Sequence, residues 1–266
     1  MTTSQPIGIF DSGLGGLTVA RAIRDRLPRE SVIYFGDTAR VPYGSKSQDT
    51  VIRFTREAIG FLVHHEVKCI VVACNTASAL ALPAVADSAG VPVIGVIEPG
   101  ARAAVAASVT GKIGVIGTTA TINSEAYTRA IRSLKPGVTV YAQPCPLFVP
   151  LAEEGWEDRP STALIAEEYL APLRTARIDV LVLGCTHYPL LARPIAAFMG
   201  PAVTLVDSAS TCAAELEHLL AARSLLASAG DGGESFFVTD AAARFSELGA
   251  RFLGRRIQAI KVVGHE

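Results

Sequence analysis

Two short segments of the chain resemble each other, and in each an apolar run leads into a cysteine. Residues 71–76 read Val-Val-Ala-Cys-Asn-Thr, and residues 182–187 read Val-Leu-Gly-Cys-Thr-His. A short run of Val, Ile and Leu bounded by Gly or Asn is typical of a buried parallel strand. Functional residues of open α/β sheets gather at the carboxyl ends of such strands. The two thiols can therefore face each other across a cleft.

A second pair of matching segments indicates that a whole domain is duplicated. Residues 7–12, Ile-Gly-Ile-Phe-Asp-Ser, resemble residues 113–118, Ile-Gly-Val-Ile-Gly-Thr, and the matches keep their order along the chain. Their offset of roughly 110 residues is far longer than the roughly 20 to 50 residues of a solenoid repeat. Apolar runs alternate with amphipathic segments, which predicts mostly parallel sheets covered by helices. We expect an α/β protein of two pseudosymmetric domains, with the active site in the cleft between them.

The expected domains divide the chain into three parts. We expect residues 1–97 and residues 208–266 to form the first, discontinuous α/β domain, because the tail ends in apolar segments that can return to the first unit. Residues 98–207 are expected to form the second α/β domain. Its strands are predicted near Ile113, Val138, Val180 and Val203.

Composition and charge argue against several classes of protein. The chain has 266 residues, 50% of them hydrophobic, but its apolar runs are interrupted well before the ~20 residues needed to cross a bilayer. Met1–Phe10 lacks the features of a signal peptide, so we expect a cytoplasmic protein without a membrane partner. Lys and Arg number 24 against 25 Asp and Glu, with no basic block. This balance argues against nucleic acid as the main partner.

Five cysteines without a CxxC spacing argue against both a disulfide framework and a structural zinc site. We therefore expect free thiols. The contexts of Cys69, Cys145 and Cys212 predict structural packing. The mirrored Cys74 and Cys185 are the candidates for chemistry.

The turn Gly13-Leu14-Gly15-Gly16 invites comparison with dinucleotide-binding loops. The GxGxxG fingerprint would need glycine at position 18, where this chain has Thr18. We interpret the segment as a tight strand-to-helix turn that brings backbone close to a small anion.

Five segments together resemble the signature segments of the bacterial glutamate racemase family. They occur in the family's order and are Phe10–Gly13, Pro42–Gly44, Ala73–Thr76, Pro146–Pro150 and Gly184–Pro189. The resemblance implies a cofactor-independent racemase that uses two thiols, needs neither pyridoxal phosphate nor metal, and supplies D-glutamate for peptidoglycan. It also implies the two-domain pseudosymmetric fold and a homodimer.

Inversion at an α carbon explains why two mirrored thiols are needed. A proton must leave one face of the carbon and another must arrive at the opposite face, which one fixed base cannot do. We expect Cys74 and Cys185 to act as the acid and base. A free thiol is only a few per cent ionised at neutral pH. Each cysteine is expected to precede a helix, begun by Asn75-Thr76 and by Thr186-His187, whose positive end would lower the thiol pKa by about one unit.

The resemblance assigns further proton-handling residues to the two thiols. It places Asp11 near Cys74 and His187 near Cys185. His187 is expected to take the thiol proton, and Asp11 to bind the substrate ammonium. An acidic residue after the segment 148–150 is also implied; it is Glu153 or Glu154, and we prefer Glu153.

Neutral donors are expected to hold the substrate carboxylates, because a fixed positive charge would bias the two thiols. With Asp11 and His187, the expected substrate-binding residues are Ser12, Pro42, Tyr43, Gly44, Asn75, Thr76, Thr118 and Thr186. No arginine is among them.

Three alternatives stay open at this point. Within the racemase class, aspartate or another acidic amino acid can replace glutamate as the substrate. A zinc enzyme can use Cys74, Cys185 and His187 as a Cys2His site. Two lobes around a cleft can also form an amino-acid-binding sensor that closes on its ligand without turnover.

Overall fold

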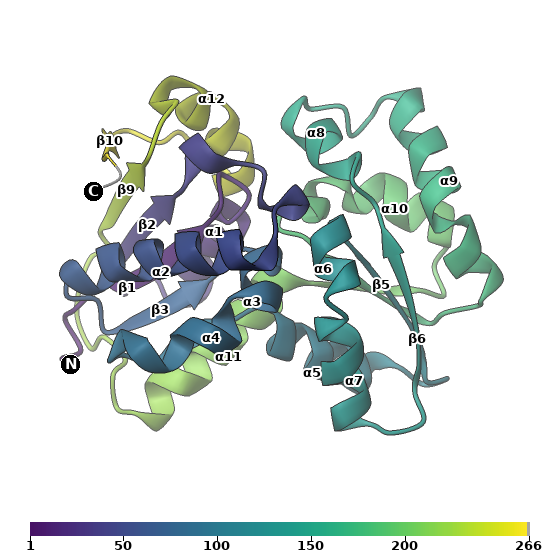
Figure 1. Cartoon of the computed structure of the whole chain (residues 1–266), viewed down its shortest axis with the longest axis horizontal. Helices are drawn as coiled ribbons and strands as arrows, with labels where there is room; N and C mark the ends of the chain where they lie inside the picture. Colours follow the sequence, from purple (N-terminus) through teal and green to yellow (C-terminus); the bar gives the residue numbers. More distant parts are fainter. Residues whose placement is uncertain (265–266) are drawn as a thin grey trace.

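The computed structural model describes residues 1–264, which form two α/β lobes lying side by side (Figure 1). The first lobe is built on a six-stranded sheet, in the order β10-β9-β2-β1-β3-β4, and the second on a four-stranded sheet, in the order β6-β5-β7-β8. The first sheet comprises β1 (Ile7–Asp11), β2 (Val32–Gly36), β3 (Cys69–Val72), β4 (Val93–Gly95), β9 (Glu234–Val238) and β10 (Ile260–Val262). The second comprises β5 (Lys112–Gly117), β6 (Thr139–Pro144), β7 (Val180–Gly184) and β8 (Thr204–Asp207). Neighbouring strands in both sheets pair in parallel, which confirms the predicted fold class.

The two sheets repeat one topology. The strand order β2-β1-β3-β4 of the first lobe corresponds position by position to β6-β5-β7-β8 of the second. In the first lobe Phe10 pairs with Val72, and in the second Ile116 pairs with Leu183. These are the strands of the matching sequence segments, so the sequence repeat is also a repeat of structure.

The C-terminal tail extends the first sheet. β9 pairs with β2, and β10 pairs with β9. α11 (Ser208–Ala222) packs against both α1 (Leu17–Arg26) and α5 (Ile97–Ala107), so it bridges the lobes. The expected domain boundaries at 97/98 and 207/208 stay predictions, and residues 265–266 lie outside the described residues.

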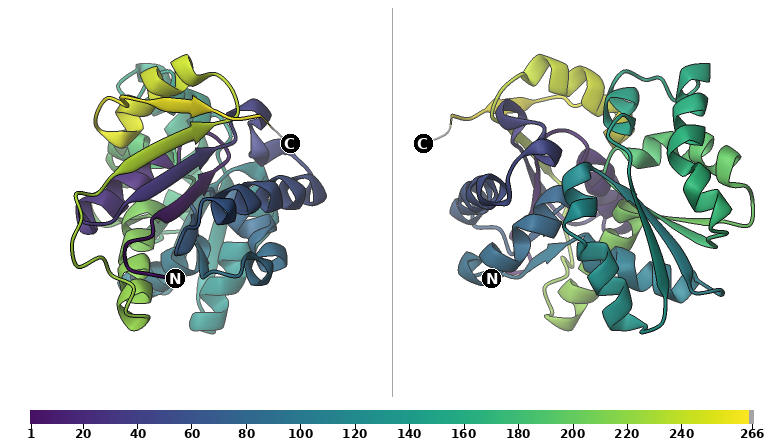
Figure 2. Two further views of the ribbon diagram at one scale, coloured as in Figure 1. Left: turned by 90° about the vertical axis from the view of Figure 1, so that its left-hand side faces the viewer. Right: turned by 45° about the vertical axis from the view of Figure 1, so that its right-hand side comes forward.

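Helices cover both faces of the first sheet (Figure 2). Ile9 of β1 belongs to the same buried cluster as Leu17 of α1, whereas its neighbour Phe10 belongs to the cluster that contains Phe54 of α2. This alternation follows from the period of two of a strand.

The remaining α-helices are α2 (Gln48–His64), α3 (Asn75–Leu80), α4 (Leu82–Val85), α6 (Thr119–Asn123), α7 (Ala126–Leu134), α8 (Phe148–Glu153), α9 (Pro160–Thr175), α10 (Ala192–Met199) and α12 (Ala242–Leu253). Short 3-10 helices are η1 (Thr38–Arg40), η2 (Tyr43–Ser45), η3 (Ala86–Ala89) and η4 (Tyr188–Leu191).

Burial explains why the central strands are almost entirely apolar. Every residue of β1, β3 and β7 is buried, because helices cover both sides of these strands. The polar residues come where the strands end: Ser12 after β1, Cys74 after β3 and Cys185 after β7.

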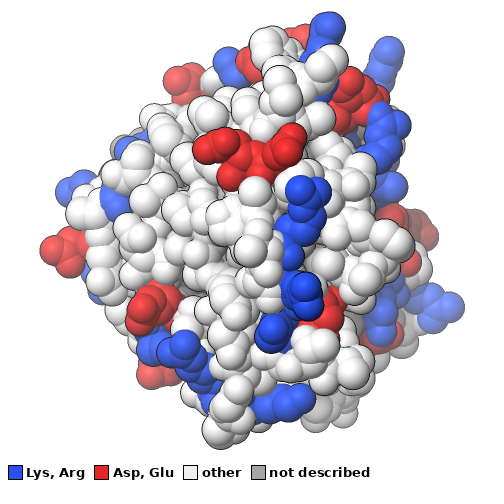
Figure 3. Space-filling model, turned by 90° about the vertical axis from the view of Figure 1, so that its right-hand side faces the viewer, with Lys and Arg blue, Asp and Glu red and all other residues white. Residues whose placement is uncertain are grey.

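The outer face of the second lobe carries charges of both signs (Figure 3). Basic and acidic side chains are interspersed there, and large areas carry neither. This face therefore lacks the continuous basic surface that nucleic-acid binding requires.

Within residues 1–264, the structure contains no helix with the length and apolarity needed to cross a membrane.

Candidate active site

Both mirrored cysteines line one cavity of about 360 Å³, a size that fits a small ligand. Twelve of the expected site residues contribute to its wall: Ser12, Pro42, Tyr43, Gly44, Cys74, Asn75, Thr76, Thr118, Glu153, Cys185, Thr186 and His187. The wall also contains residues outside the expected set of site residues: Gly13, Leu14, Thr38, Val41, Val149, Ala241, Arg244 and Phe245. The last three come from the C-terminal tail, outside every recognised segment.

Cys74 occupies the N-cap position of α3, and Ala73 separates it from the end of β3. Its Sγ donates to Oγ of Ser12 at 3.4 Å and accepts a hydrogen bond from the backbone N–H of Ala77 at 3.5 Å. Burial, reinforced by the negative charge of Asp11, raises the pKa of Cys74 to about 12, and the two hydrogen bonds offset only part of this rise. The hydrogen bond from the helix end lowers the pKa, as expected, but desolvation outweighs it, so the net shift of this thiol is upward.

Asp11 is the last residue of β1 and is almost completely buried. Its Oδ2 accepts a hydrogen bond from the backbone N–H of Gly13 at 2.8 Å, while Oδ1 has no hydrogen-bond partner among the described residues. Burial raises the pKa of Asp11, although the charge of His187 and backbone N–H groups act in the opposite direction. Asp11 is not among the residues that line the cavity.

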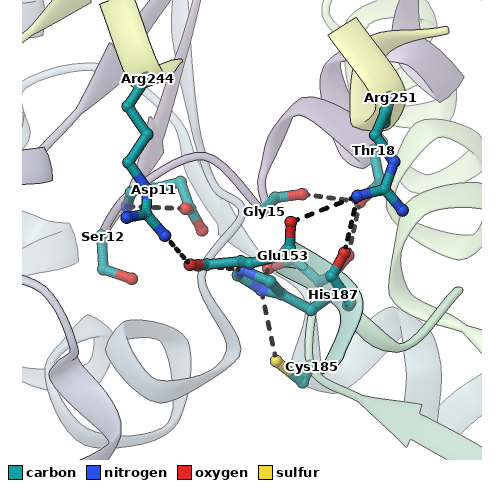
Figure 4. A network of polar contacts seen from close by, with 12 residues as sticks. Asp11, Ser12, Gly15, Thr18, Glu153, Cys185, His187, Arg244 and Arg251 are labelled. Carbon is teal, nitrogen blue, oxygen red and sulfur yellow. Dashed lines mark hydrogen bonds and ion pairs between the residues drawn. The ribbon is translucent and has the colours of Figure 1, made fainter. Parts of the chain in front are cut away.

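Cys185 begins a chain of polar contacts (Figure 4). Its Sγ lies 3.8 Å from Nδ1 of His187, and Nε2 of His187 lies 3.1 Å from Oε1 of Glu153. The other carboxylate oxygen of Glu153, Oε2, lies 3.4 Å from Nη2 of Arg244. Glu153 ends α8, whereas the neighbouring Glu154 is exposed.

The charges of this chain of contacts stabilise one another. Burial opposes a charged imidazole, but hydrogen bonds to Cys185 and Glu153 outweigh it and raise the pKa of His187 to about 10. The hydrogen bond from His187 lowers the pKa of Glu153, against the effect of its partial burial. At neutral pH the pair is therefore an imidazolium and a carboxylate.

The helix expected directly after Cys185 begins later than predicted. His187 is the N-cap of the 3-10 helix η4, and α10 follows only at Ala192. The backbone N–H of Tyr188 donates to the carbonyl oxygen of Cys185 at 3.1 Å. The main partner of the Cys185 side chain is thus the imidazole ring and not a helix end.

The glycine-rich turn allows the two lobes to lie close together. A Cβ added at Gly15 would stand 2.3 Å from Oγ1 of Thr186 and 2.4 Å from Nδ1 of His187. At Gly16 it would stand 2.5 Å from Cβ of Asp11. Here glycine is required because side chains of the site occupy the space. The expected close approach of this turn to a small anion stays a prediction.

Threonine hydroxyls join the lobes on the Cys74 side. Oγ1 of Thr76, from the first lobe, lies 3.0 Å from Oγ1 of Thr118 and 3.3 Å from Oγ1 of Thr121, both from the second. Thr118 also caps α6 by accepting from the backbone N–H of Thr121 at 3.2 Å. These hydroxyls can rotate between donating to one another and donating to a ligand.

The side chain of Asn75 is held by buried hydrogen bonds within the protein. Its Oδ1 accepts from the hydroxyl of Tyr127 at 2.7 Å, and its Nδ2 donates to Oγ of Ser208 at 3.1 Å. Tyr127 and Ser208, which sequence reasoning missed, therefore fix the residue that follows Cys74.

Tyr43 and Gly44 form part of a loop anchored beneath the cavity. The hydroxyl of Tyr43 donates to Oδ2 of Asp37 at 2.5 Å, and the same oxygen accepts from Nε of Arg40 at 2.7 Å. An added Cβ at Gly44 would stand 2.9 Å from Cβ of Thr118. The loop of the first lobe thus presses its backbone against the second lobe.

Arg244 is an arginine in the cavity wall that lies outside the expected set of site residues. It lines the cavity from α12, and its guanidinium pairs with Glu153. No local pattern distinguished this residue, because it lies far along the chain from the residues it meets.

The zinc alternative requires Cys74, Cys185 and His187 to lie together as one set of metal ligands. Among residues 1–264, no group of three or more His, Cys, Asp and Glu side chains is arranged to hold a metal ion. Cys74, Cys185 and His187 line one cavity but do not form such a group.

The fold and site define a class of protein: two parallel-sheet lobes that meet around a small cavity holding a pair of mirrored thiols. Residues 17–216 match the family model described as Asp/Glu/Hydantoin racemase. The chain belongs to this racemase family.

Relatives similar over the full length confirm the resemblance to glutamate racemases. A glutamate racemase from Chlorobaculum tepidum is 52% identical over 266 residues, covering 99% of this chain and 98% of the relative. One from Geobacter metallireducens is 52% identical over 263 residues, covering 98% of this chain and 97% of the relative. The crystal structure of glutamate racemase from Francisella tularensis in complex with D-glutamate superimposes with a TM-score of 0.94 at 40% identity, covering 99% of both chains.

Proposed function

We propose that this protein interconverts L-glutamate and D-glutamate without a cofactor, with Cys74 and Cys185 as the acid and base. The observation that carries the proposal is the shared cavity: each thiol follows an equivalent strand, and both line the same small space. Relatives named glutamate racemase, and a similar structure that holds D-glutamate, support glutamate as the substrate. By the same resemblance, we propose that the product supplies peptidoglycan synthesis and that the protein acts as a homodimer.

The proposed reaction breaks one C–H bond and forms another. A thiolate on one side takes the α proton, and the electron pair left on the α carbon is stabilised by the adjacent carboxylate and ammonium groups. The thiol on the opposite side then gives its proton to the other face of the carbon. The two sulfurs have exchanged protonation states, so the enzyme is ready for the opposite enantiomer.

The environments of the two sulfurs suggest how the resting enzyme is prepared. The raised pKa of Cys74 keeps this residue a thiol in the empty cavity. The imidazolium of His187, held by Glu153, favours the thiolate of Cys185 through its charge. The substrate ammonium brings the positive charge that Cys74 lacks when it must become the base.

The test is proton exchange in heavy water. Each enantiomer of glutamate and of aspartate is incubated with the protein, and the α-proton NMR signal and the optical rotation are followed together. We expect loss of the α proton and loss of rotation for glutamate. A sensor would leave both unchanged, and faster turnover of aspartate would favour the other acidic substrate.

Cysteine variants test the assignment of the two bases. Cys74→Ser and Cys185→Ser are each expected to lower racemisation by on the order of 10² to 10⁴-fold, the range for general acid–base groups. The matched control is Cys212→Ser, since Cys212 is buried in α11 away from the cavity wall. Near-normal turnover in either cavity variant would contradict the two-base proposal.

Light scattering during size-exclusion chromatography tests the proposed homodimer.

A further inference from the structure

α12 contains Arg251, which makes a dense set of contacts with the far lobe (Figure 4). Its Nη1 donates to the carbonyl oxygens of Ala152 at 3.2 Å and Glu153 at 3.3 Å. Its Nη2 donates to both carboxylate oxygens of Glu157 at 2.8 Å. One guanidinium thus holds the end of α8 and the turn that follows it.

The turn after α8 is shaped around this guanidinium. Gly155 has a φ of +71°, and a Cβ added there would stand 2.9 Å from Nη1 and 3.1 Å from Cζ of Arg251. The planar guanidinium of arginine has several N–H donors in fixed directions and can bind several acceptors at once. The ammonium group of lysine, at the end of a flexible side chain, cannot reproduce this arrangement.

The segment that Arg251 holds carries the proton-handling pair of one thiol. Glu153 reaches Nε2 of His187, whose Nδ1 faces Cys185. The next residue of α12, Phe252, packs edge-on against the imidazole, with 5.1 Å between ring centroids. α12 therefore contacts the backbone of Glu153 and the ring of His187 at the same turn.

Cys74 is supported in a different way. Its Sγ contacts Ser12 and Ala77, which belong to its own lobe. A change in α12 should therefore be felt first at Cys185.

We propose that Arg251 is a positioning residue that fixes the end of α8, so that Glu153 meets His187, and thereby sets the reactivity of Cys185 but not of Cys74. The inference rests on the proposed function, which gives Cys185 its proton-transfer role. Loss of the guanidinium lets Glu153 move away from the imidazole, and His187 then favours the thiolate less strongly.

The first test measures thiol reactivity in the substrate-free protein. Wild-type and Arg251→Gln proteins are treated with iodoacetamide at pH 8, and labelling of each cysteine is followed by mass spectrometry. We expect labelling of Cys185 to slow several-fold and labelling of Cys74 to stay unchanged. The control Arg102→Gln, which removes the exposed ion pair of Arg102 with Glu215, should leave both rates unchanged.

The second test is a double-mutant cycle with Glu153→Gln. We expect Arg251→Gln alone to lower kcat/KM by about tenfold, within the ~100-fold that a misplacement of about 1 Å can cause. In the Glu153→Gln background the same change should have little further effect, because Arg251 acts through Glu153. Enantiomers have equal free energies, so kcat/KM must fall equally in both directions.

A purely structural role predicts different results. Slower labelling at both cysteines or at neither, or a full additional loss of activity in the Glu153→Gln background, would overturn the inference. Arg251→Lys is measured alongside, since it keeps the positive charge but loses the planar guanidinium. If Arg251→Gln does not fold, the same measurements on Arg251→Lys test the inference. Turnover retained in Cys185→Ser would refute the proposed function instead, and the labelling result would stand independently.

Discussion

Gly15 of the first lobe lies directly against His187 of the second. The space that a Cβ at Gly15 would need is filled by the imidazole nitrogen Nδ1, only 2.4 Å away. This nitrogen is the one that faces Cys185. The position of the histidine ring relative to its thiol therefore depends on the absence of a side chain in the opposite lobe.

Replacing Gly15 by alanine should displace His187 and lower the racemisation rate. We expect a loss of about tenfold or more in kcat, because a displacement of about 1 Å can cause a loss of up to ~100-fold. The control is Gly60→Ala in α2, where an added Cβ meets nothing within 4 Å. That control should keep full activity and gain up to ~1 kcal/mol of stability from better helix propensity. Unchanged turnover in Gly15→Ala would show that the ring tolerates the displacement.

The two thiols should respond differently to pH. With its pKa raised to about 12, Cys74 is ionised in only about one molecule in 10⁴ at pH 8. Labelling of Cys74 by iodoacetamide should therefore be slow at pH 8 and rise about tenfold per pH unit, while Cys185, beside the imidazolium, is labelled first. Mass spectrometry of the labelled cysteines at pH 7, 8 and 9 measures both rates. Equal rates at the two sites would contradict this asymmetry.

The fold was predictable from sequence because repetition and burial leave strong patterns. The apolar runs before Cys74 and Cys185 are strands β3 and β7, and matching segments lie in equivalent positions of the two sheets. The sequence also predicts that Ser12 and Thr118, which directly follow β1 and β5, belong to the site, and both residues line the cavity.

The contributions of the tail and of burial were not predictable. Arg244 and Arg251 reach the site through the packing of α12 on the far lobe, which no local periodicity encodes. The pKa of Cys74 depends on desolvation, and this was underestimated because the sequence shows the helix end but not the depth of burial.

His187 should contribute to stability in a pH-dependent way. Its folded-state pKa of about 10 lies above the ~6.5 of an unfolded chain, so the contribution is complete below about pH 6.5 and is lost as the pH rises toward 10. The difference in unfolding free energy between wild type and His187→Asn should therefore shrink from pH 6 to pH 10. Urea unfolding at both pH values measures it, with the exposed His218 replaced by asparagine as the matched control. If the difference in unfolding free energy instead grew with pH, the assignment of a positive charge to His187 in the folded protein would be wrong.

A buried ion pair at the other end of β3 should govern stability and not catalysis. The fully buried Lys68 pairs with Glu30 at 2.5 Å, and its Nζ also donates to the carbonyl oxygens of Thr3 and Leu225 at 2.8 Å. Lys68→Met leaves the carboxylate of Glu30 buried without its cation, which should lower the free energy of unfolding by about 3 to 5 kcal/mol.

The double variant Lys68→Met with Glu30→Gln should recover part of that loss, because no uncompensated charge remains buried. Urea unfolding measures both variants. Lys68 precedes β3, whereas Cys74 follows it, so the folded fraction of each variant should keep a near-normal kcat at low temperature. Loss of turnover without loss of stability would instead connect this ion pair to the cavity.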